Sequence, residues 1–282
     1  MVHPAFDISN IDPAVTPDNC QLLIEISGQA FNYILYTRTP DQLYLLRQYR
    51  IYTSGDKTNR DILEEIIAGD SVLQKYASQA AIVYNFPEST IFPAELYSKE
   101  VKDPAISLLY GSIDHQYVFE EAVKEKEMYN VYLITRDLHS LLQDKFKGSQ
   151  YWHLYSLLLQ WPTSEEKEVP NATRIVFYND KFIAAVYRQG ALQLIQTFAY
   201  QTPEDAAYYL LLICKQLRIS QHEMTLFISG LIDSQSALYT ELLKYFDVVH
   251  YESLPATYGT NGLLDEYPSH YFSPLLKMSL CV

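Results

Sequence analysis

Apolar and polar residues follow each other in the second half of the chain in an order that predicts three strands, then a helix. Leu192, Leu194 and Phe198 alternate with polar neighbours, as in a half-buried strand. Turn residues, Asn179-Asp180 and Gln189-Gly190, separate the runs. The predicted elements are strands over 174–178, 182–187 and 192–198, a helix from 203, a strand over 225–229, a helix over about 233–246 and a strand over 248–251. The order is β-β-β-α-β-α-β.

The first half repeats the beginning of this order. It predicts strands over 21–26, 31–37 and 43–51, a helix from 59, and a strand over 80–84. Both helices begin with T-x-x-D, Thr58 to Asp61 and Thr202 to Asp205, where threonine caps the helix and the acid stabilises the positive end of its dipole. Because the elements recur at similar spacing although residue identity is low, the pattern predicts an internal duplication.

The stretch from 86 to 161 is less regular, because Pro87, Pro93 and Pro104 interrupt it. It predicts a hairpin with strands over 117–123 and 129–135, a helix over 137–146, and a segment over 151–159 that fits either a strand or a helix. We therefore expect a first domain over 1–161, with an inserted subdomain around 86–135, and a second domain over 171–282. The polar, proline-flanked stretch 162–170 is the expected boundary.

Composition places the chain among globular proteins. It has 282 residues, 48% of them hydrophobic and 20% charged. We expect no membrane span, since no apolar run approaches the roughly 20 residues that a spanning helix needs. The first residues lack the pattern of a secretory signal, so we expect a cytoplasmic protein. Cys20, Cys214 and Cys281 lie far apart, which indicates reduced thiols rather than disulfides or a zinc site.

Charge and aromatic content narrow the classes of partner. A net charge of −13 opposes binding to nucleic acid, because neutralising phosphates supplies most of that affinity. The 25 tyrosines favour a β-rich protein with binding surfaces. Many aromatic residues crowd the irregular middle: Tyr84, Tyr97, Tyr110, Tyr117, Tyr129, Tyr132, Tyr151, Tyr155, Trp152 and Trp161. That density near the inserted subdomain is typical of a protein-binding surface.

The duplicated unit resembles the actin, sugar kinase and Hsp70 superfamily. Within it, the chain is similar over nearly its whole length to an uncharacterised Bacteroidetes family with an actin-like ATPase domain. The resemblance rests on the order and spacing of the elements. It implies an α/β fold with two RNase H-like β-β-β-α-β-α-β domains and a small insertion in the first.

The resemblance also implies where a nucleotide would bind. Active members of the superfamily hold phosphates on a glycine-rich turn in the first hairpin of each half, with an acidic residue that positions metal or water. The matching residues are Glu25, Ser27, Gly28 and Gln29 in the first half, Asn179 and Asp180 in the second, and Ser229-Gly230 where the superfamily has an adenosine-contacting glycine pair. Glu25 stands in place of aspartate, Gly28 is alone in its turn, and the second turn has no glycine.

Each of these positions also has a structural interpretation. On this interpretation both turns are ordinary hairpin turns, Gly230 allows close packing of a strand against a helix, and Glu25 is a solvated carboxylate at a strand end. An RNase H-like nuclease would need an acidic counterpart to Glu25 on the strand over 80–84, which has none. The seven histidines have no spacing suited to a metal site, and the cluster of Ser112, Asp114 and His115 is expected to be a loop.

These observations lead to two functional hypotheses. The first is a degenerate actin-like protein, a pseudo-ATPase without catalytic residues, metal or cofactor, that acts by binding another protein. The second is an enzyme that binds or hydrolyses ATP with magnesium through diverged phosphate loops. Only 9 glycines in the chain favour the first, because wrapping backbone around a triphosphate requires glycine.

Overall fold

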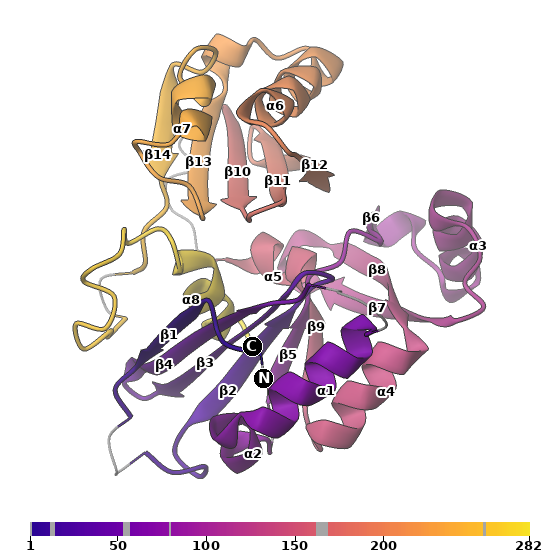
Figure 1. The fold of residues 1–282 in the computed structure, drawn as a ribbon. Helices are drawn as coiled ribbons and strands as arrows, with labels where there is room; N and C mark the ends of the chain where they lie inside the picture. Colours follow the sequence, from indigo (N-terminus) through magenta and orange to yellow (C-terminus); the bar gives the residue numbers. More distant parts are fainter. Residues whose placement is uncertain (1, 12–14, 53–56, 79, 162–168, 256–257) are drawn as a thin grey trace. The chain divides into compact units, whose positions relative to one another are not determined.

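A computed structural model describes residues 2–11, 15–52, 57–78, 80–161, 169–255 and 258–282. It divides into two compact units, each described here by itself (Figure 1). Unit 1 is Met1–Gln160 with Ala256–Leu264 and Cys281–Val282, and unit 2 is Trp161–Pro255 with Asp265–Leu280. Most of the expected boundary stretch, 162–168, lies outside the described residues.

Unit 1 is built on a six-stranded sheet in the order β1-β4-β3-β2-β5-β9. The strands are β1 (Phe6–Ser9), β2 (Gln21–Ile26), β3 (Ala30–Arg38), β4 (Asp41–Arg50), β5 (Ala81–Tyr84) and β9 (Gln150–His153). β2, β3 and β4 form an antiparallel meander, whereas β2, β5 and β9 run parallel. The carboxyl ends of these three parallel strands therefore meet at one edge of the sheet, where open α/β sheets usually bind ligands.

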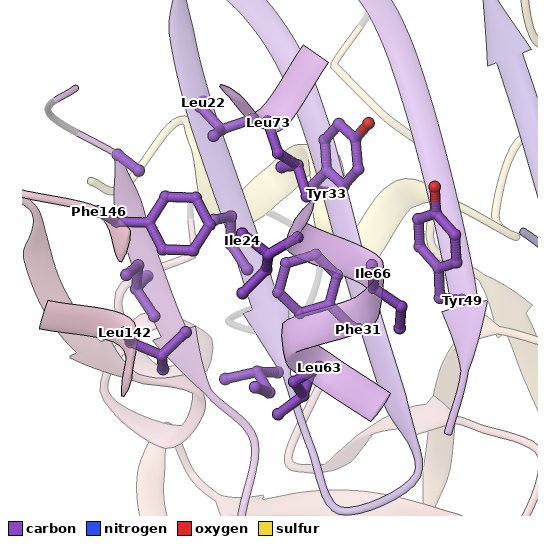
Figure 2. Packing of buried hydrophobic residues seen from close by; sticks show 14 of the residues in the cluster. Leu22, Ile24, Phe31, Tyr33, Tyr49, Leu63, Ile66, Leu73, Leu142 and Phe146 are labelled. Carbon is purple, nitrogen blue, oxygen red and sulfur yellow. The ribbon is translucent and has the colours of Figure 1, made fainter. Parts of the chain in front are cut away.

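Three helices cover one face of this sheet: α1 (Asn59–Gly69), α2 (Ser71–Tyr76) and α4 (Arg136–Lys145) (Figure 1). Figure 2 shows how Leu63 and Ile66 of α1 and Leu142 of α4 pack on Ile24 and Phe31 of the sheet. The apolar residues of α1 recur at helical spacing, so one stripe of the helix is buried. This burial is the main force that holds the helices on the sheet.

The predicted helix caps form in both units. Thr58 accepts a hydrogen bond from the backbone N–H of Asp61, whose carboxylate accepts one from the backbone N–H of Thr58. Thr202 and Asp205 make the same capping box at the start of α6 (Pro203–Leu217). Each box satisfies two backbone donors that a helix start would otherwise leave open.

A second, three-stranded sheet lies within unit 1 in the order β6-β8-β7. Its strands are β6 (Ser89–Pro93), β7 (Gln116–Val123) and β8 (Met128–Thr135), and β7 and β8 are the predicted hairpin. The short helices η1 (Ala94–Leu96) and η2 (Lys124–Lys126) and the longer α3 (Lys99–Tyr110) accompany it. Pro104 lies inside α3, so the expectation that it interrupts regular structure was wrong.

Unit 2 has a five-stranded sheet in the order β12-β11-β10-β13-β14. Its strands are β10 (Asn171–Phe177), β11 (Lys181–Arg188), β12 (Ala191–Ala199), β13 (Thr225–Gly230) and β14 (Val248–Tyr251). The meander again leads into parallel strands, because β13 is parallel to both β10 and β14. Five strands of unit 1 have the same order, β4-β3-β2-β5-β9.

Helices cover the unit 2 sheet as well. Apolar residues of α6 and α7 (Ala237–Leu242), including Leu210 and Leu242, pack against Ile175 and Ile228 of the sheet. α7 is much shorter than the predicted helix over 233–246.

The segment 151–159 of unit 1, which the sequence left open between strand and helix, contains both, since β9 is followed directly by α5 (Leu154–Gln160). No helix among the described residues is long and apolar enough to cross a membrane.

A buried ionic cluster lies between the unit 2 sheet and α8 (Ser273–Ser279). The carboxylate of Glu252 pairs with the Nε atom of Arg174 at 3.0 Å and with the Nζ atom of Lys277 at 3.5 Å. The ring of Trp161 lies 5.2 Å from the Arg174 guanidinium carbon and 5.4 Å from the Lys277 ammonium. Burial of such charges is tolerated only when they are paired in this way.

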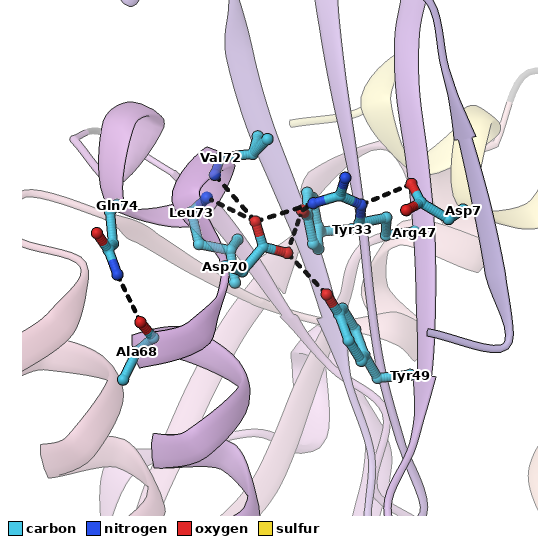
Figure 3. Close-up of polar contacts among 9 residues, drawn as sticks. All are labelled: Asp7, Tyr33, Arg47, Tyr49, Ala68, Asp70, Val72, Leu73 and Gln74. Atoms are coloured by element: carbon cyan, nitrogen blue, oxygen red, sulfur yellow. Dashed lines mark hydrogen bonds and ion pairs between the residues drawn. The ribbon is translucent and has the colours of Figure 1, made fainter. Parts of the chain in front are cut away.

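A second buried network joins α1 and α2 to the sheet of unit 1 (Figure 3). The Asp70 carboxylate accepts hydrogen bonds from the hydroxyls of Tyr33 at 2.5 Å and Tyr49 at 2.8 Å, and from Nη1 of Arg47 at 3.0 Å. Arg47 in turn donates to Asp7 of β1 at 2.7 Å. Burial alone would raise the pKa of Asp70, but these three donors outweigh it, so that its pKa lies below the ordinary value.

We expect Asp70→Ala to lower the free energy of unfolding by about 2–4 kcal/mol at pH 7, because it leaves two buried hydroxyls without their acceptor and the partly buried Arg47 with Asp7 alone. Asp70→Asn removes the negative charge but keeps the size and shape of the side chain. Since the folded-state pKa is depressed, the stabilisation by the carboxylate is complete above about pH 4 and is lost as pH falls through the folded pKa.

Urea unfolding followed by circular dichroism, at pH 7 and at steps below pH 4, measures both effects. The difference between wild type and Asp70→Asn should shrink as the pH falls. The exposed Asp144→Ala is the matched control and should stay within about 0.5 kcal/mol of wild type. A constant difference across this pH range would contradict the assignment.

Candidate functional site

Glu25 lies near the carboxyl end of β2 and is buried, with only 3% of its surface exposed. Its Oε2 atom accepts a hydrogen bond from Nδ2 of Asn32 at 3.0 Å, and its Oε1 atom accepts one from Nδ2 of Asn85 at 2.8 Å. The expectation of a solvated carboxylate was therefore wrong. The two strands beside β2 bring the amides to it: Asn32 is paired with Glu25 across the antiparallel ladder, and Asn85 directly follows the parallel strand β5.

This arrangement bears on whether Glu25 could hold a metal. Magnesium takes carboxylate and other oxygen ligands, and each carboxylate oxygen of Glu25 accepts one amide N–H. Among the described residues, no group of three or more histidine, cysteine, aspartate or glutamate side chains is placed to hold a metal ion.

The turn after β2 is closed by one of its own side chains. The hydroxyl oxygen of Ser27 accepts hydrogen bonds from the backbone N–H groups of Gln29 at 3.4 Å and Ala30 at 3.1 Å. The carbonyl of Gly28 accepts one from Nδ2 of Asn59 at 3.1 Å. A phosphate-binding turn needs its N–H groups to point at the ligand. Here Ser27 occupies two of them.

The corresponding turn of unit 2 is also closed. The backbone N–H of Tyr178 donates to the carbonyl of Lys181 at 2.8 Å, with Asn179 and Asp180 as the central residues. Tyr200 holds the turn from the side, because its N–H donates to the carbonyl of Asp180 at 3.0 Å and its hydroxyl to that of Tyr178 at 2.7 Å. This is the geometry of an ordinary hairpin.

Gly230 is confined by backbone. Its φ is +83°, and a Cβ atom added there would lie 2.2 Å from the carbonyl oxygen of Phe177 on the neighbouring strand β10. That carbonyl accepts the N–H of Leu231 at 2.8 Å, while the hydroxyl of Ser229 donates to the carbonyl of Ile175 at 3.3 Å. The close approach that requires glycine is thus between two strands, not between a strand and a helix.

The two glycines of the predicted site should respond differently to substitution. Gly230→Ala should lower the free energy of unfolding by at least about 2 kcal/mol, because of the positive φ and the contact with the Phe177 carbonyl. Gly28→Ala should stay near wild type, since no atom lies within 4 Å of an added Cβ. Chemical denaturation of both variants checks this, and equal stabilities would contradict the packing role of Gly230.

Three aromatic residues of the middle stretch, Tyr84, Tyr117 and Tyr151, lie around His139 of α4. The Nδ1 atom of His139 lies 2.7 Å from the hydroxyl of Tyr84, and the rings of Phe119 and Tyr151 lie 4.9 and 4.7 Å from its ring. Burial lowers the pKa of His139, which favours the neutral imidazole. Asn32, Asn85 and His139 were not predicted as parts of a polar site, because only strand pairing and helix packing bring them to their partners.

Glu121 is an unusual carboxyl group near the end of β9. It accepts hydrogen bonds from the hydroxyl of Tyr132 at 2.6 Å and from the backbone N–H of His153 at 2.8 Å. Burial outweighs these donors and raises the pKa of Glu121 to about 7. It was not singled out from the sequence, where it is one acid in a charged hairpin.

Because the pKa of Glu121 is raised in the folded protein, the folded state favours the protonated form of this carboxyl group. The cost of ionising Glu121 should therefore lower stability as pH rises from the unfolded value near 4.3 to about 7, by roughly 1–3 kcal/mol. Glu121→Gln should remove this loss, so its stability relative to wild type rises between pH 4.5 and pH 8. Denaturation curves at several pH values test it, with the exposed Glu125→Gln as control. A gain that is independent of pH would contradict it.

One pocket of about 480 Å³ opens beside the small sheet of unit 1. It is lined by Pro93, Ala94, Glu95, Ala122, Lys124, Glu127, Met128 and Tyr129. None of the eight residues predicted to contact a nucleotide lines it. Glu25, Ser27, Gly28 and Gln29 lie in unit 1. Asn179, Asp180, Ser229 and Gly230 lie in unit 2.

Comparison with known proteins agrees with this fold. The model of a protein family of unknown function, DUF3822, matches residues 10–249. The chain belongs to the DUF3822 family. No curated protein matches its sequence.

Solved structures similar to this DUF3822 chain share its architecture. A protein of Bacteroides thetaiotaomicron with an actin-like ATPase fold and unknown function is 17% identical, with a TM-score of 0.76 over 93% of this chain and 96% of that one. The PilM-PilN complex of type IV pilus biogenesis gives 10% identity and a TM-score of 0.58, over 93% and 98%. At such identities the similarity shows the fold alone, and it confirms the resemblance to actin-like proteins.

Proposed function

We propose that this DUF3822 protein is a non-catalytic member of the actin-like fold that acts by binding another protein. The observation that carries the proposal is the closed state of the phosphate-loop positions. Glu25 accepts hydrogen bonds from two amides, and Ser27 accepts them from two backbone N–H groups of its own turn. A nucleotide would have to break these hydrogen bonds before it gained its own.

Two further points support the proposal. Gly230 is explained by the backbone of Phe177 alone, without a ligand. The PilM-PilN structure is a complex between two proteins, so a protein of this fold takes part in a protein assembly. The expected cytoplasmic location goes with the proposal, since Cys20, Cys214 and Cys281 lie far apart in the sequence.

Nucleotide binding by the full chain tests the catalytic alternative. Magnesium with ATP, ADP or GTP at millimolar concentration should leave the melting temperature unchanged, and no phosphate should be released. Gly28→Val is the matched variant, because a Cβ added at Gly28 has no atom within 4 Å, yet the side chain would obstruct a phosphate at the turn. A saturable stabilisation that Gly28→Val abolishes would overturn the proposal in favour of an ATP-binding protein.

The positive part of the proposal requires a partner that binds without nucleotide. Tagged protein should capture a specific partner from cells of its native host, and apyrase treatment should not release it. The complex should then form again from the two purified proteins. Capture that depends on added ATP would contradict a pseudo-ATPase that acts by binding alone.

A further inference from the structure

β12 is the edge strand of the unit 2 sheet, and among the described residues no strand pairs with its outer side (Figure 1). The backbone N–H of Tyr200 donates to the carbonyl of Asp180 at 3.0 Å, which fixes how the two strands of the hairpin alternate. Every second residue of an antiparallel strand bonds to its neighbour. The N–H and C=O groups of Ile195 and Ala199 therefore point away from β11.

Burial falls sharply at this edge. β10 and β11 each contain six consecutive buried residues, whereas β12 contains none. Its apolar side chains are only half-buried: Leu192, Leu194, Ile195 and Phe198. Each of them has the neighbouring strand β11 on one side only. One more strand at this edge would cover them and would pair the outward backbone groups at the same time.

The other sheet edges are protected in the ways that natural proteins use against edge-to-edge pairing. β1, β9 and β14 have four residues each, β6 has five and ends in Pro93, and β7 carries Glu120 and Glu121. β12 has nine residues, with no charge and no proline. A bulge lies at Gln193, which has no residue opposite it on β11, but Leu194–Ala199 is regular. This segment is therefore an edge without the usual protection.

Charge selects the occupant of the edge. The chain has a net charge of −13, yet Lys181–Pro203 is the longest stretch of its sequence without aspartate or glutamate. Two copies that repel each other through most of their surface thus meet no carboxylate along this hairpin. Antiparallel pairing of β12 with itself also sets no like charges opposite each other, because every side chain in it is uncharged.

Going beyond the proposed function, we propose that Leu194–Ala199 pairs with the same segment of a second copy, antiparallel about a two-fold axis. The two unit 2 sheets then continue as one sheet across the axis. Backbone hydrogen bonds supply the pairing, and the half-buried side chains of one copy cover those of the other.

Analytical ultracentrifugation of the full chain over the micromolar range tests the proposal, and wild type should pass from monomer to dimer. Gln196 is exposed and lies near its own counterpart across the axis. Gln196→Lys and Gln196→Glu should each raise the dissociation constant at least about tenfold, since each sets like charges side by side. An equimolar mixture of the two variants should restore the dimer, because opposite charges then meet.

Val248→Lys is the matched control, at a position 39% exposed on β14, the opposite edge of the same sheet. It should leave the dissociation constant unchanged. The melting temperatures of all three variants, measured where every protein is monomeric, should equal that of wild type, which separates lost association from lost folding.

Amide hydrogen exchange locates the contact. The outward N–H groups of Ile195 and Ala199 should exchange more slowly as the wild-type concentration rises, and Gln196→Lys should show no such change. The N–H of Gln196, which points toward β11, should be protected at every concentration.

Three outcomes overturn the proposal. One is a wild-type chain that stays monomeric throughout. Another is a dimer that the Gln196 variants leave intact, because the contact then lies elsewhere. The third is a monomer that loses a captured host protein in Gln196→Lys, which makes the occupant a strand of another protein. Nucleotide binding and apyrase release are measured separately, so failure here is distinguishable from failure of the proposed function.

Discussion

The candidate site of unit 1 is organised around the buried carboxylate of Glu25. A carboxylate with 3% exposure must have hydrogen-bond donors, because an unpaired buried charge costs several kcal/mol. Its donors come from the next strand of the meander and from the residue that follows the parallel strand β5. Glu25 therefore ties together the three strand ends at the edge of the sheet where this class of fold usually receives a ligand.

The other candidate positions also make contacts within their own units. The Ser27 hydroxyl accepts the N–H groups of Gln29 and Ala30, Tyr200 donates to two carbonyls of the unit 2 turn, and Gly230 admits the carbonyl of Phe177. A binding loop for phosphate keeps its donors open for the ligand.

The small subdomain of unit 1 differs from this inward arrangement. Ile106 joins α3 to its sheet, while apolar residues on the opposite side of the helix stay exposed. Apolar surface in water is unfavourable, and Leu108 is 87% exposed.

The sequence by itself determined the local structure and the order of elements. The T-x-x-D caps, the alternation along the meanders and the spacing from cap to strand act within a few residues, so they could be read without the fold. The order of elements was enough to indicate an actin-like architecture. The sequence pattern predicted a longer helix than α7 and predicted that Pro104 interrupts regular structure. Both predictions were wrong because tertiary packing sets where a helix ends and whether it tolerates proline.

Only the tertiary structure decided the state of the candidate site. Glu25, Asn32 and Asn85 are separated along the chain, and nothing near Glu25 in sequence shows that two amides will meet it. The same holds for the charges of Arg174 and Glu252, and for the Phe177 carbonyl that requires glycine at 230. Burial and pairing depend on which strands become neighbours, and that is a property of the assembled sheet rather than of any segment.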